Sequence, residues 1–370
     1  MRIAIDARLS YRFQGGITQY TLNLVRALAA IDQQNSYTIF QRSADQRTIV
    51  SQKNFRRVSL HTPAHHPLEQ YILSLELLTH SAIDMIHWTD FIPPFYYRRP
   101  SVITVHDLHF LLYPHFLTRD SAKYYGLIDR AVRRADHIIA VSKATKQDLI
   151  RLTGTPRKKI TVIYEAAESI YFPIQNQEAL ERIRHKHHLP EKYILFVGTI
   201  EPRKNLKTLI RAYQMLIANY KIDVDLAIAG KPGWLYDDVH QLVQELSLQE
   251  RVHFLGRVST ADLPLLYNAA QMFTLPSFYE GFGLPPLEAM ACGIPVIVSD
   301  TSSMPEVVGD AALRVEPEDT EGFAVAMHRL MTEQDLRQDM IAKGQKRVKA
   351  FSWERAAQET LAVYHKLAQR

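Results

Sequence analysis

The chain has 370 residues, of which 46% are hydrophobic and 22% charged, and its formal net charge is +5. This length predicts two globular domains, and the single cysteine, Cys292, excludes an internal disulfide and fits a reducing compartment. Because no apolar run reaches about 18 residues and the N-terminus resembles a strand rather than a signal peptide, we expect a cytoplasmic protein without a membrane span.

Strand and helix signals alternate along the first half of the chain. Apolar runs predict strands at residues 2–7, 37–41, 57–61, 84–88, 102–106, 136–142 and 159–164. Apolar spacing predicts helices at residues 18–30, 68–79, 121–134 and 143–153. This alternation predicts a parallel sheet that helices cover on both faces.

The alternation stops between residues 165 and 191, where we expect a hinge, and then resumes. The second half predicts strands at residues 193–197, 225–229, 252–255, 272–275, 295–298 and 312–315. We therefore expect one domain at residues 1–167 and another at 168–352. A last helix at about 353–370 has no strand after it, and we expect it to cross back to the first domain.

The segment 277–293 follows a predicted buried strand and is the most informative stretch of the sequence. Gly281 and Gly283 let the backbone approach a ligand closely, and the N-terminus of the helix that follows attracts an anion. Glu280 and Glu288 frame this loop and can accept hydrogen bonds from hydroxyls. A sugar nucleotide has both groups that such a site would bind: phosphate for the amides and hydroxyls for the carboxylates. The alternative is an ordinary surface loop before a core helix.

A second candidate segment, residues 198–205, also lies between a predicted strand and a helix. Arg203 and Lys204 would stand at the carboxyl end of a parallel strand, where two cations suit a diphosphate. Cations at a helix start oppose the helix dipole, which is a weak argument that something anionic offsets them. The alternative is that both side chains are simply solvated.

Two further candidates lie in the first half. His106 ends a predicted strand and should face a cleft. A metal bound by His106 and His109 is disfavoured, because on an extended segment the two rings would diverge. Gly15 and Gly16 lie in an expected tight turn at residues 14–17. Either the turn needs glycine because its φ is positive, or the backbone amides of the two glycines bind a phosphate.

Taken together, these sequence segments resemble those of the retaining glycosyltransferases of family GT4. The resemblance rests on E-x7-E from Glu280 to Glu288, G-x-x-x-x-R-K-N at 198–205, V-H-D at 105–107 and V-S-x-x-T at 141–145. It implies an α/β protein of the GT-B fold, with two Rossmann-like doubly wound domains that face a cleft. It also implies transfer of a hexose from a nucleoside diphosphate to a hydroxyl, with retention at the anomeric carbon.

The resemblance also implies roles for individual residues. Arg203 and Lys204 would stabilise the departing diphosphate, Glu280 would hold sugar hydroxyls, Glu288 would bind the ribose, and His106 would orient the sugar. No metal and no cofactor are expected. The residues expected to bind the donor are Gly15, Gly16, Gly198, Arg203, Lys204, Arg257, Val258, Glu280, Gly281, Phe282, Gly283, Leu284 and Glu288.

Likeness to bacterial polysaccharide mannosyltransferases favours GDP-mannose as the donor over UDP-glucose, and a glycan or lipid-linked acceptor. Residues 1–165 hold 22 Lys and Arg against 13 Asp and Glu, or +9, whereas residues 166–370 hold 22 against 26, or −4. The basic half could contact an anionic membrane at its inner face, although a solvated surface with scattered charge is the favoured explanation. Nucleic acid is not expected. The alternatives in function are a sugar-nucleotide epimerase or hydrolase, or a non-catalytic sugar-nucleotide-binding partner.

Overall fold

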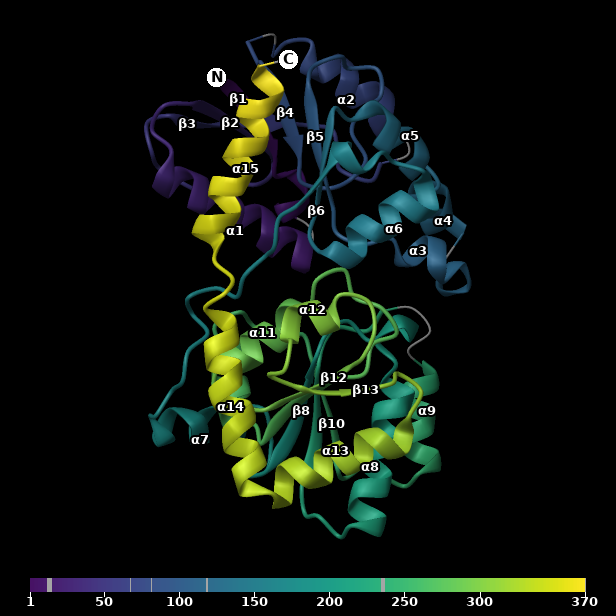
Figure 1. Cartoon of the computed structure of the whole chain (residues 1–370). Helices are drawn as coiled ribbons and strands as arrows, with labels where there is room; N and C mark the ends of the chain where they lie inside the picture. The colour runs from purple at the N-terminus through teal and green to yellow at the C-terminus, as the bar shows by residue number, and fades with distance from the viewer. Residues whose placement is uncertain (12–14, 67, 81, 118, 234–236, 370) are drawn as a thin grey trace. The chain divides into compact units, whose positions relative to one another are not determined.

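The computed structural model describes residues 1–11, 15–66, 68–80, 82–117, 119–233 and 237–369. The chain divides into two compact units (Figure 1). Unit 1 comprises residues 1–165 and 352–370, and unit 2 comprises residues 166–351. The division falls two residues before the boundary expected at 167/168.

Unit 1 contains a seven-stranded parallel sheet in the order β3-β2-β1-β4-β5-β6-β7. Residues of β4, β5 and β6 are buried throughout, because helices cover both faces of the sheet. The strand order reverses between β1 and β4, and ligands of such sheets bind at this switch point, beyond the carboxyl ends of the strands. The strands are β1 (Arg2–Asp6), β2 (Ser36–Arg42), β3 (Phe55–Leu60), β4 (Met85–Trp88), β5 (Ser101–Val105), β6 (His137–Ala140) and β7 (Ile160–Val162).

The helices of unit 1 pack two apolar clusters against the opposite faces of this sheet. They are η1 (Arg8–Tyr11), α1 (Gly16–Ile31), α2 (Glu69–Leu77), α3 (His109–Leu112), η2 (Pro114–Phe116), α4 (Arg119–Tyr125), α5 (Ile128–Arg134), α6 (Lys143–Thr153), η3 (Arg157–Lys159) and α15 (Trp353–Ala368). Although α15 is the last helix of the chain, it packs along α1 in unit 1 (Figure 1). Its Tyr364 hydroxyl lies 2.7 Å from His87 Nδ1 on β4.

Unit 2 contains a six-stranded parallel sheet in the order β10-β9-β8-β11-β12-β13, which repeats the topology of unit 1. The strands are β8 (Tyr193–Val197), β9 (Asp225–Ala229), β10 (Val252–Gly256), β11 (Met272–Leu275), β12 (Val296–Ser299) and β13 (Leu313–Val315). The helices are α7 (Gln177–Lys186), η4 (Pro202–Lys204), α8 (Leu206–Asn219), α9 (Asp237–Glu245), α10 (Leu263–Ala269), α11 (Leu284–Ala291), α12 (Met304–Val308), α13 (Thr320–Thr332) and α14 (Gln334–Val348).

The predicted parallel α/β sheets are confirmed, and each predicted strand is present with ends that differ by at most two residues. One expectation was wrong. The helix predicted at 121–134 is two helices, α4 and α5, separated by Gly126 and Leu127, and glycine disfavours a helix interior. The stretch 165–191, where the hinge was expected, begins at the division between the units and contains the helix α7, which Asn176 caps by accepting a hydrogen bond from the amide of Ala179.

Candidate active site

Most of the predicted donor-binding residues lie at one edge of the unit 2 sheet. The segments that carry them leave the carboxyl ends of three parallel strands: residues 198–205 follow β8, Arg257 follows β10, and residues 276–284 follow β11. The loop at 300–303 after β12 joins them at the same edge. Parallel strands bring their carboxyl ends together, so segments far apart in sequence meet here.

Arg203 and Lys204, which follow β8, converge on Glu280, which follows the neighbouring strand β11. Lys204 Nζ donates to Glu280 Oε1 at 2.6 Å, and Arg203 Nη1 donates to Glu280 Oε2 at 2.9 Å. The side chains of Arg203, Lys204 and Glu280 are 12%, 9% and 9% exposed, respectively. This is a shielded ion cluster, in which charge interactions are much stronger than at the surface.

A residue that the sequence analysis missed, Glu201, balances the cluster. Arg203 Nη2 donates to Glu201 Oε1 at 2.7 Å, and the Glu201 side chain is 7% exposed. The cluster therefore holds two cations and two anions. The anions that offset these cations are therefore Glu201 and Glu280 of the chain itself, so the position of the cations is by itself no argument for a bound anion. The sequence carried a signal for Glu201, since it stands two residues before Arg203 in the same turn.

The charge state of Glu280 follows from this environment. Burial alone would raise its pKa, but the adjacent charges of Lys204 and Arg203 outweigh burial and lower the pKa to about 2. Ser277 Oγ also donates to Glu280 Oε1 at 2.5 Å. Glu280 is therefore an anion across the physiological pH range, and it is held by three donors from two loops.

The turn before α11 requires glycine. Gly283 is the N-cap of α11 and has φ of 105°, a conformation that side chains disfavour. A Cβ atom there would stand 2.2 Å from Met304 Cε. Ser303 Oγ donates to the carbonyls of Glu280 and Phe282 at 2.9 and 2.7 Å. The loop that carries the buried Gly281 and Phe282 is thus fixed, and it leads directly to Leu284 as the first residue of α11.

A close approach of two chain segments supports the turn after β8. A Cβ atom at Gly230, which follows β9, would stand 1.7 Å from the carbonyl oxygen of Gly198. The amide of Gly198 donates to Ala229 O at 2.9 Å. Gly230 therefore has to lack a side chain for the turn of residues 198–205 to lie where it does. The sequence analysis did not single it out, although it directly follows the strand predicted at 225–229.

Glu288 lies in a different environment from Glu280. It is one turn into α11, and its Oε2 accepts from the hydroxyl of Tyr267 on α10 at 2.9 Å. Burial raises its pKa to about 7, even though hydrogen bonds from Tyr267 and Tyr171 act in the opposite direction. Two neutral hydroxyls therefore donate to Glu288, and the nearby charge of Glu168 also raises its pKa, whereas two cations hold Glu280.

The remaining predicted donor-binding residues of unit 2 are Arg257 and Val258. Both follow β10 at the carboxyl edge of the sheet, where Arg257 is exposed and Val258 half-buried. The structure thus brings them to the same edge as Arg203, Lys204 and Glu280 without placing them in the ion cluster.

In unit 1, the structure places His106 directly after β5. Its Nε2 lies 2.9 Å from the backbone carbonyl of Thr89, and its Nδ1 lies 3.3 Å from Glu165 Oε1. Tyr20 of α1 packs edge-on against the ring, with centroids 4.9 Å apart. Burial lowers the pKa of His106, but the hydrogen bond and the charge of Glu165 outweigh it and raise the pKa above its ordinary value.

The glycine pair lies at the start of α1, and the alternative of a turn with positive φ does not hold for either glycine. Gly15 is the extended N-cap, with φ of −168°, and Gly16 is the first helical residue. An added Cβ would meet nothing within 4 Å at either position. The surroundings do not require glycine at either position, and phosphate binding by the amides at the start of α1 stays a prediction. Gln14 of the expected turn lies outside the described residues.

A small pocket of about 70 Å³ in unit 1 lies beside these residues. It is lined by Ile17, His65, Asp90, Phe91, His106, Asp107, His109, Phe110 and Tyr125. Asp90 Oδ2 lies 2.7 Å from His65 Nε2 and accepts from Tyr124 Oη at 3.2 Å. Glu165 and Asp90 were missed by the sequence analysis. Asp90 had a signal, because it follows the predicted strand 84–88 at the same sheet edge as His106.

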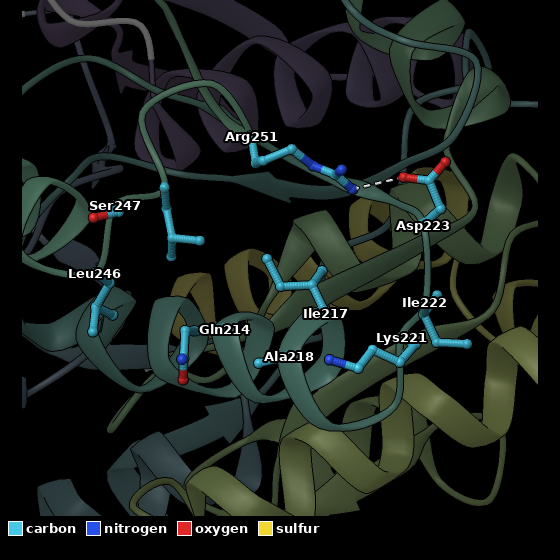
Figure 2. A pocket seen from close by; sticks show the side chains of 10 residues that line it. Gln214, Ile217, Ala218, Lys221, Ile222, Asp223, Leu246, Ser247 and Arg251 are labelled. Carbon is cyan, nitrogen blue, oxygen red and sulfur yellow. Dashed lines mark hydrogen bonds and ion pairs between the residues drawn. The ribbon is translucent and has the colours of Figure 1, made fainter.

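A larger pocket, about 500 Å³, lies at the other edge of the unit 2 sheet (Figure 2). Asp223 and Arg251, which pair across it at 2.9 Å, stand just before the amino ends of β9 and β10. Ligands of parallel α/β sheets bind beyond the carboxyl ends, so this pocket is not the candidate active site. In the described part of the chain, no cluster of His, Cys, Asp and Glu has metal-binding geometry, and no helix is long and apolar enough to cross a membrane.

Comparisons with known proteins agree with this arrangement. The family model "Glycosyltransferase Family 4" matches residues 14–167, and the model "Glycosyl transferases group 1" matches residues 177–347. The chain is 34% identical to O-antigen chain mannosyltransferase B of Escherichia coli, over 94% of this chain and 95% of that protein. It is 32% identical to the O-antigen chain mannosyltransferase RfbU of Salmonella typhimurium, over 63% of this chain and 61% of that protein.

The fold has close counterparts among solved structures. Sucrose-phosphate synthase of Thermosynechococcus elongatus superimposes with a TM-score of 0.81 at 23% identity, over 100% of this chain and 99% of that one. This likeness shows the GT-B fold, to which the two parallel α/β units conform. With one family model on each unit and a full-length relative at 34% identity, the chain belongs to the glycosyltransferase family that these models describe.

Proposed function

We propose that this glycosyltransferase moves mannose from GDP-mannose to a hydroxyl of a glycan or lipid-linked acceptor, with retention at the anomeric carbon and without a metal ion. One observation carries the proposal. The shielded cluster of Arg203, Lys204 and Glu280 lies at the carboxyl edge of the unit 2 sheet, beside the turn that begins α11. Such a site combines fixed cations, helix amides and a permanent carboxylate.

Charge on the leaving group explains why cations belong there. As the bond between the anomeric carbon and the phosphate oxygen breaks, negative charge accumulates on the diphosphate. Arg203 and Lys204 can stabilise this charge from fixed positions, as can the amides that begin α11. To do so they would have to share their donors between Glu280 and the phosphate oxygens. Glu280 can then turn its oxygens toward sugar hydroxyls and favour an oxocarbenium-like transition state.

The acceptor hydroxyl must lose a proton when its oxygen bonds to the anomeric carbon. We assign no side chain to this step, and propose that an oxygen of the leaving diphosphate takes the proton. His106 is poorly suited to be the base, because both of its ring nitrogens face acceptors. In this proposal it orients the sugar, and Glu288 binds the ribose of the nucleotide.

The choice of mannose rests on the relatives that carry this activity in their names. UDP-glucose is the second candidate for the donor. The single cysteine, buried as a free thiol, supports a reducing, cytoplasmic location. The basic half of the sequence supports contact with an anionic membrane, at which a lipid-linked acceptor would be met.

A donor panel tests this function. Purified protein is mixed with GDP-mannose, UDP-glucose or ADP-glucose, and thermal stabilisation is measured before transfer to a soluble aryl α-mannoside is followed by NMR. We expect the largest stabilisation with GDP-mannose, and an α-linked product in the presence of a chelator. Transfer that stops in the chelator would contradict metal independence, and a β-linked product would contradict retention. Rapid epimer formation without acceptor would instead indicate an epimerase.

A further inference from the structure

Helix α2 (Glu69–Leu77) of unit 1 is apolar on the face that points away from the core. Its inner face buries Leu73 and Leu77. Exposed large hydrophobic residues are concentrated here: six of the eleven in the described part of the chain lie on this helix, at its ends or on the loop beside it. They are Leu68 (54% exposed), Tyr71 (57%), Ile72 (43%), Leu75 (67%), Leu78 (65%) and Tyr96 (52%).

The spacing of these residues makes a continuous stripe. Positions 68, 71, 72, 75 and 78 repeat at intervals of three and four, which places them on one face of a helix. Tyr96 extends the stripe sideways, because its ring stacks on Tyr71 with centroids 5.1 Å apart. Contiguous apolar patches of this kind on a folded protein mark an interaction surface.

Arginines border the stripe on the side of Tyr96. The guanidinium of Arg130 on α5 lies 5.3 Å from the centre of the Tyr96 ring and 4.3 Å from that of Phe95. Arg98 and Arg99 are exposed on the loop that follows Tyr96. Arg134 ties this loop to α5 by donating to Tyr97 O at 2.7 Å. Asp129 is the neighbouring exposed acid on α5, so cations outnumber acids at this border.

We propose that this surface, residues 68–78 with Tyr96, Arg98, Arg99 and Arg130, docks the protein on an anionic lipid membrane. The apolar stripe would enter the boundary between headgroups and acyl chains, as amphipathic helices do. The arginines would face the anionic headgroups. This proposal rests on the proposed function, because a lipid-linked acceptor gives the membrane contact its purpose.

Charge favours a membrane over a second copy of the chain. In a two-fold dimer this surface would cover a second copy of itself. Because the surface carries more cations than acids, the second copy offers the arginines no net opposite charge, and the two surfaces repel each other. An anionic lipid surface offers the opposite charge to the arginines and an apolar layer to the leucines. An anionic membrane therefore matches both the apolar stripe and the arginine border.

Vesicle sedimentation tests the proposal with the full chain. We expect the protein to sediment with vesicles of mixed phosphatidylcholine and phosphatidylglycerol much more strongly than with pure phosphatidylcholine. The double variant Leu75→Glu/Leu78→Glu should bind the mixed vesicles about ten-fold or more weakly. The affinity of Arg98→Gln/Arg99→Gln for the mixed vesicles should fall about five-fold for each charge removed. The matched control is Val325→Glu, at an exposed apolar position on α13 in unit 2, which should bind as the wild type does.

Three results would overturn the proposal. The first is that the wild-type protein stays in solution with the mixed vesicles. The second is that the leucine double variant binds these vesicles as well as Val325→Glu does. The third is that the wild type is a dimer in sedimentation velocity and Leu75→Glu/Leu78→Glu is a monomer. GDP-mannose binding is measured by calorimetry on the same preparations. A protein that binds GDP-mannose but not vesicles would refute the docking surface alone. One that binds vesicles but not GDP-mannose would refute the proposed donor alone.

Discussion

The hydrogen bonds of His106 decide its charge. A carbonyl and a carboxylate are both acceptors, so a ring that contacts Thr89 O through Nε2 and Glu165 through Nδ1 has to carry a proton on each nitrogen. The ring is then an imidazolium, which agrees with the raised pKa of His106. A nitrogen of His106 can reach a sugar only by leaving one of these partners, whereas its positive charge can act without movement.

Replacing Glu165 tests this assignment. In Glu165→Gln the carboxylate charge is lost, so the pKa of His106 should fall below its value in the wild type. Because the wild-type pKa is raised on folding, the stability that the pair contributes is present below the ordinary pKa of about 6.5 and is lost as the pH rises through the folded value. NMR titration of the His106 ring measures the shift, with the exposed Glu181→Gln as control. Superimposable titrations of His106 in both variants would contradict the assignment.

At the scale of an element, α11 carries a glutamate that burial disfavours as an anion. The pKa of Glu288 is about 7, against an ordinary value of 4.5. The folded protein therefore keeps a proton that the unfolded chain releases between these values, and stability falls as the pH rises through this window. A buried group of this kind is more common in binding sites than in cores built only for stability.

The change Glu288→Gln removes this titration. We expect the variant to gain stability relative to the wild type between pH 5 and pH 8, by up to about 2–3 kcal/mol at the higher pH. Unfolding in urea at the two pH values measures the gain, and Glu250→Gln, at an exposed site in unit 2, serves as the control. If Glu288 binds the ribose as proposed, the same variant should bind GDP more weakly. A stability difference that does not depend on pH would disprove the raised pKa.

At the scale of the whole molecule, the C-terminal helix completes unit 1. Its residues Ala356, Ala357, Val363 and Tyr364 are buried among side chains of the first 165 residues. Tyr364 lies 2.7 Å from His87 Nδ1, and Thr104 Oγ1 lies 2.8 Å from His87 Nε2. Burial lowers the pKa of His87 to about 3, so its ring is neutral and each nitrogen needs a partner. Unit 1 therefore depends on the last helix of the chain for part of its core and for a hydrogen-bond partner of His87.

Two substitutions at Tyr364 separate packing from hydrogen bonding. Tyr364→Phe should destabilise unit 1 by about 1–3 kcal/mol, because it leaves a nitrogen of His87 unpaired. Tyr364→Ala should cost about 3–5 kcal/mol, because it also creates a cavity. Lys366→Ala, exposed on the same helix, should change stability little. Chemical unfolding measures all three, and equal effects of Tyr364→Phe and Lys366→Ala would show that the contact with His87 contributes nothing.

The sequence predicted the strands of both units well because a parallel sheet buries both faces, which leaves unbroken apolar runs such as Ile194–Phe196. It also predicted that residues 198–205 and residues 277–293 would each follow a strand of a parallel sheet. It could not predict which charges pair, because pairing depends on side-chain directions across the edge. Glu165 was missed for that reason. The exposed apolar face of α2 was not singled out, because apolar spacing predicted only that residues 68–79 form a helix.

The most direct test of the central claim compares two neighbouring lysines. Lys204 is shielded and contacts Glu280, whereas Lys207 pairs with Asp238 at the surface. If the site at the edge of the unit 2 sheet stabilises a departing diphosphate, Lys204→Ala should lower the turnover of GDP-mannose by about 10²–10³-fold. Lys207→Ala should turn over GDP-mannose at close to the wild-type rate. Both variants should keep the wild-type circular dichroism spectrum. Wild-type turnover in a folded Lys204→Ala variant would contradict the account.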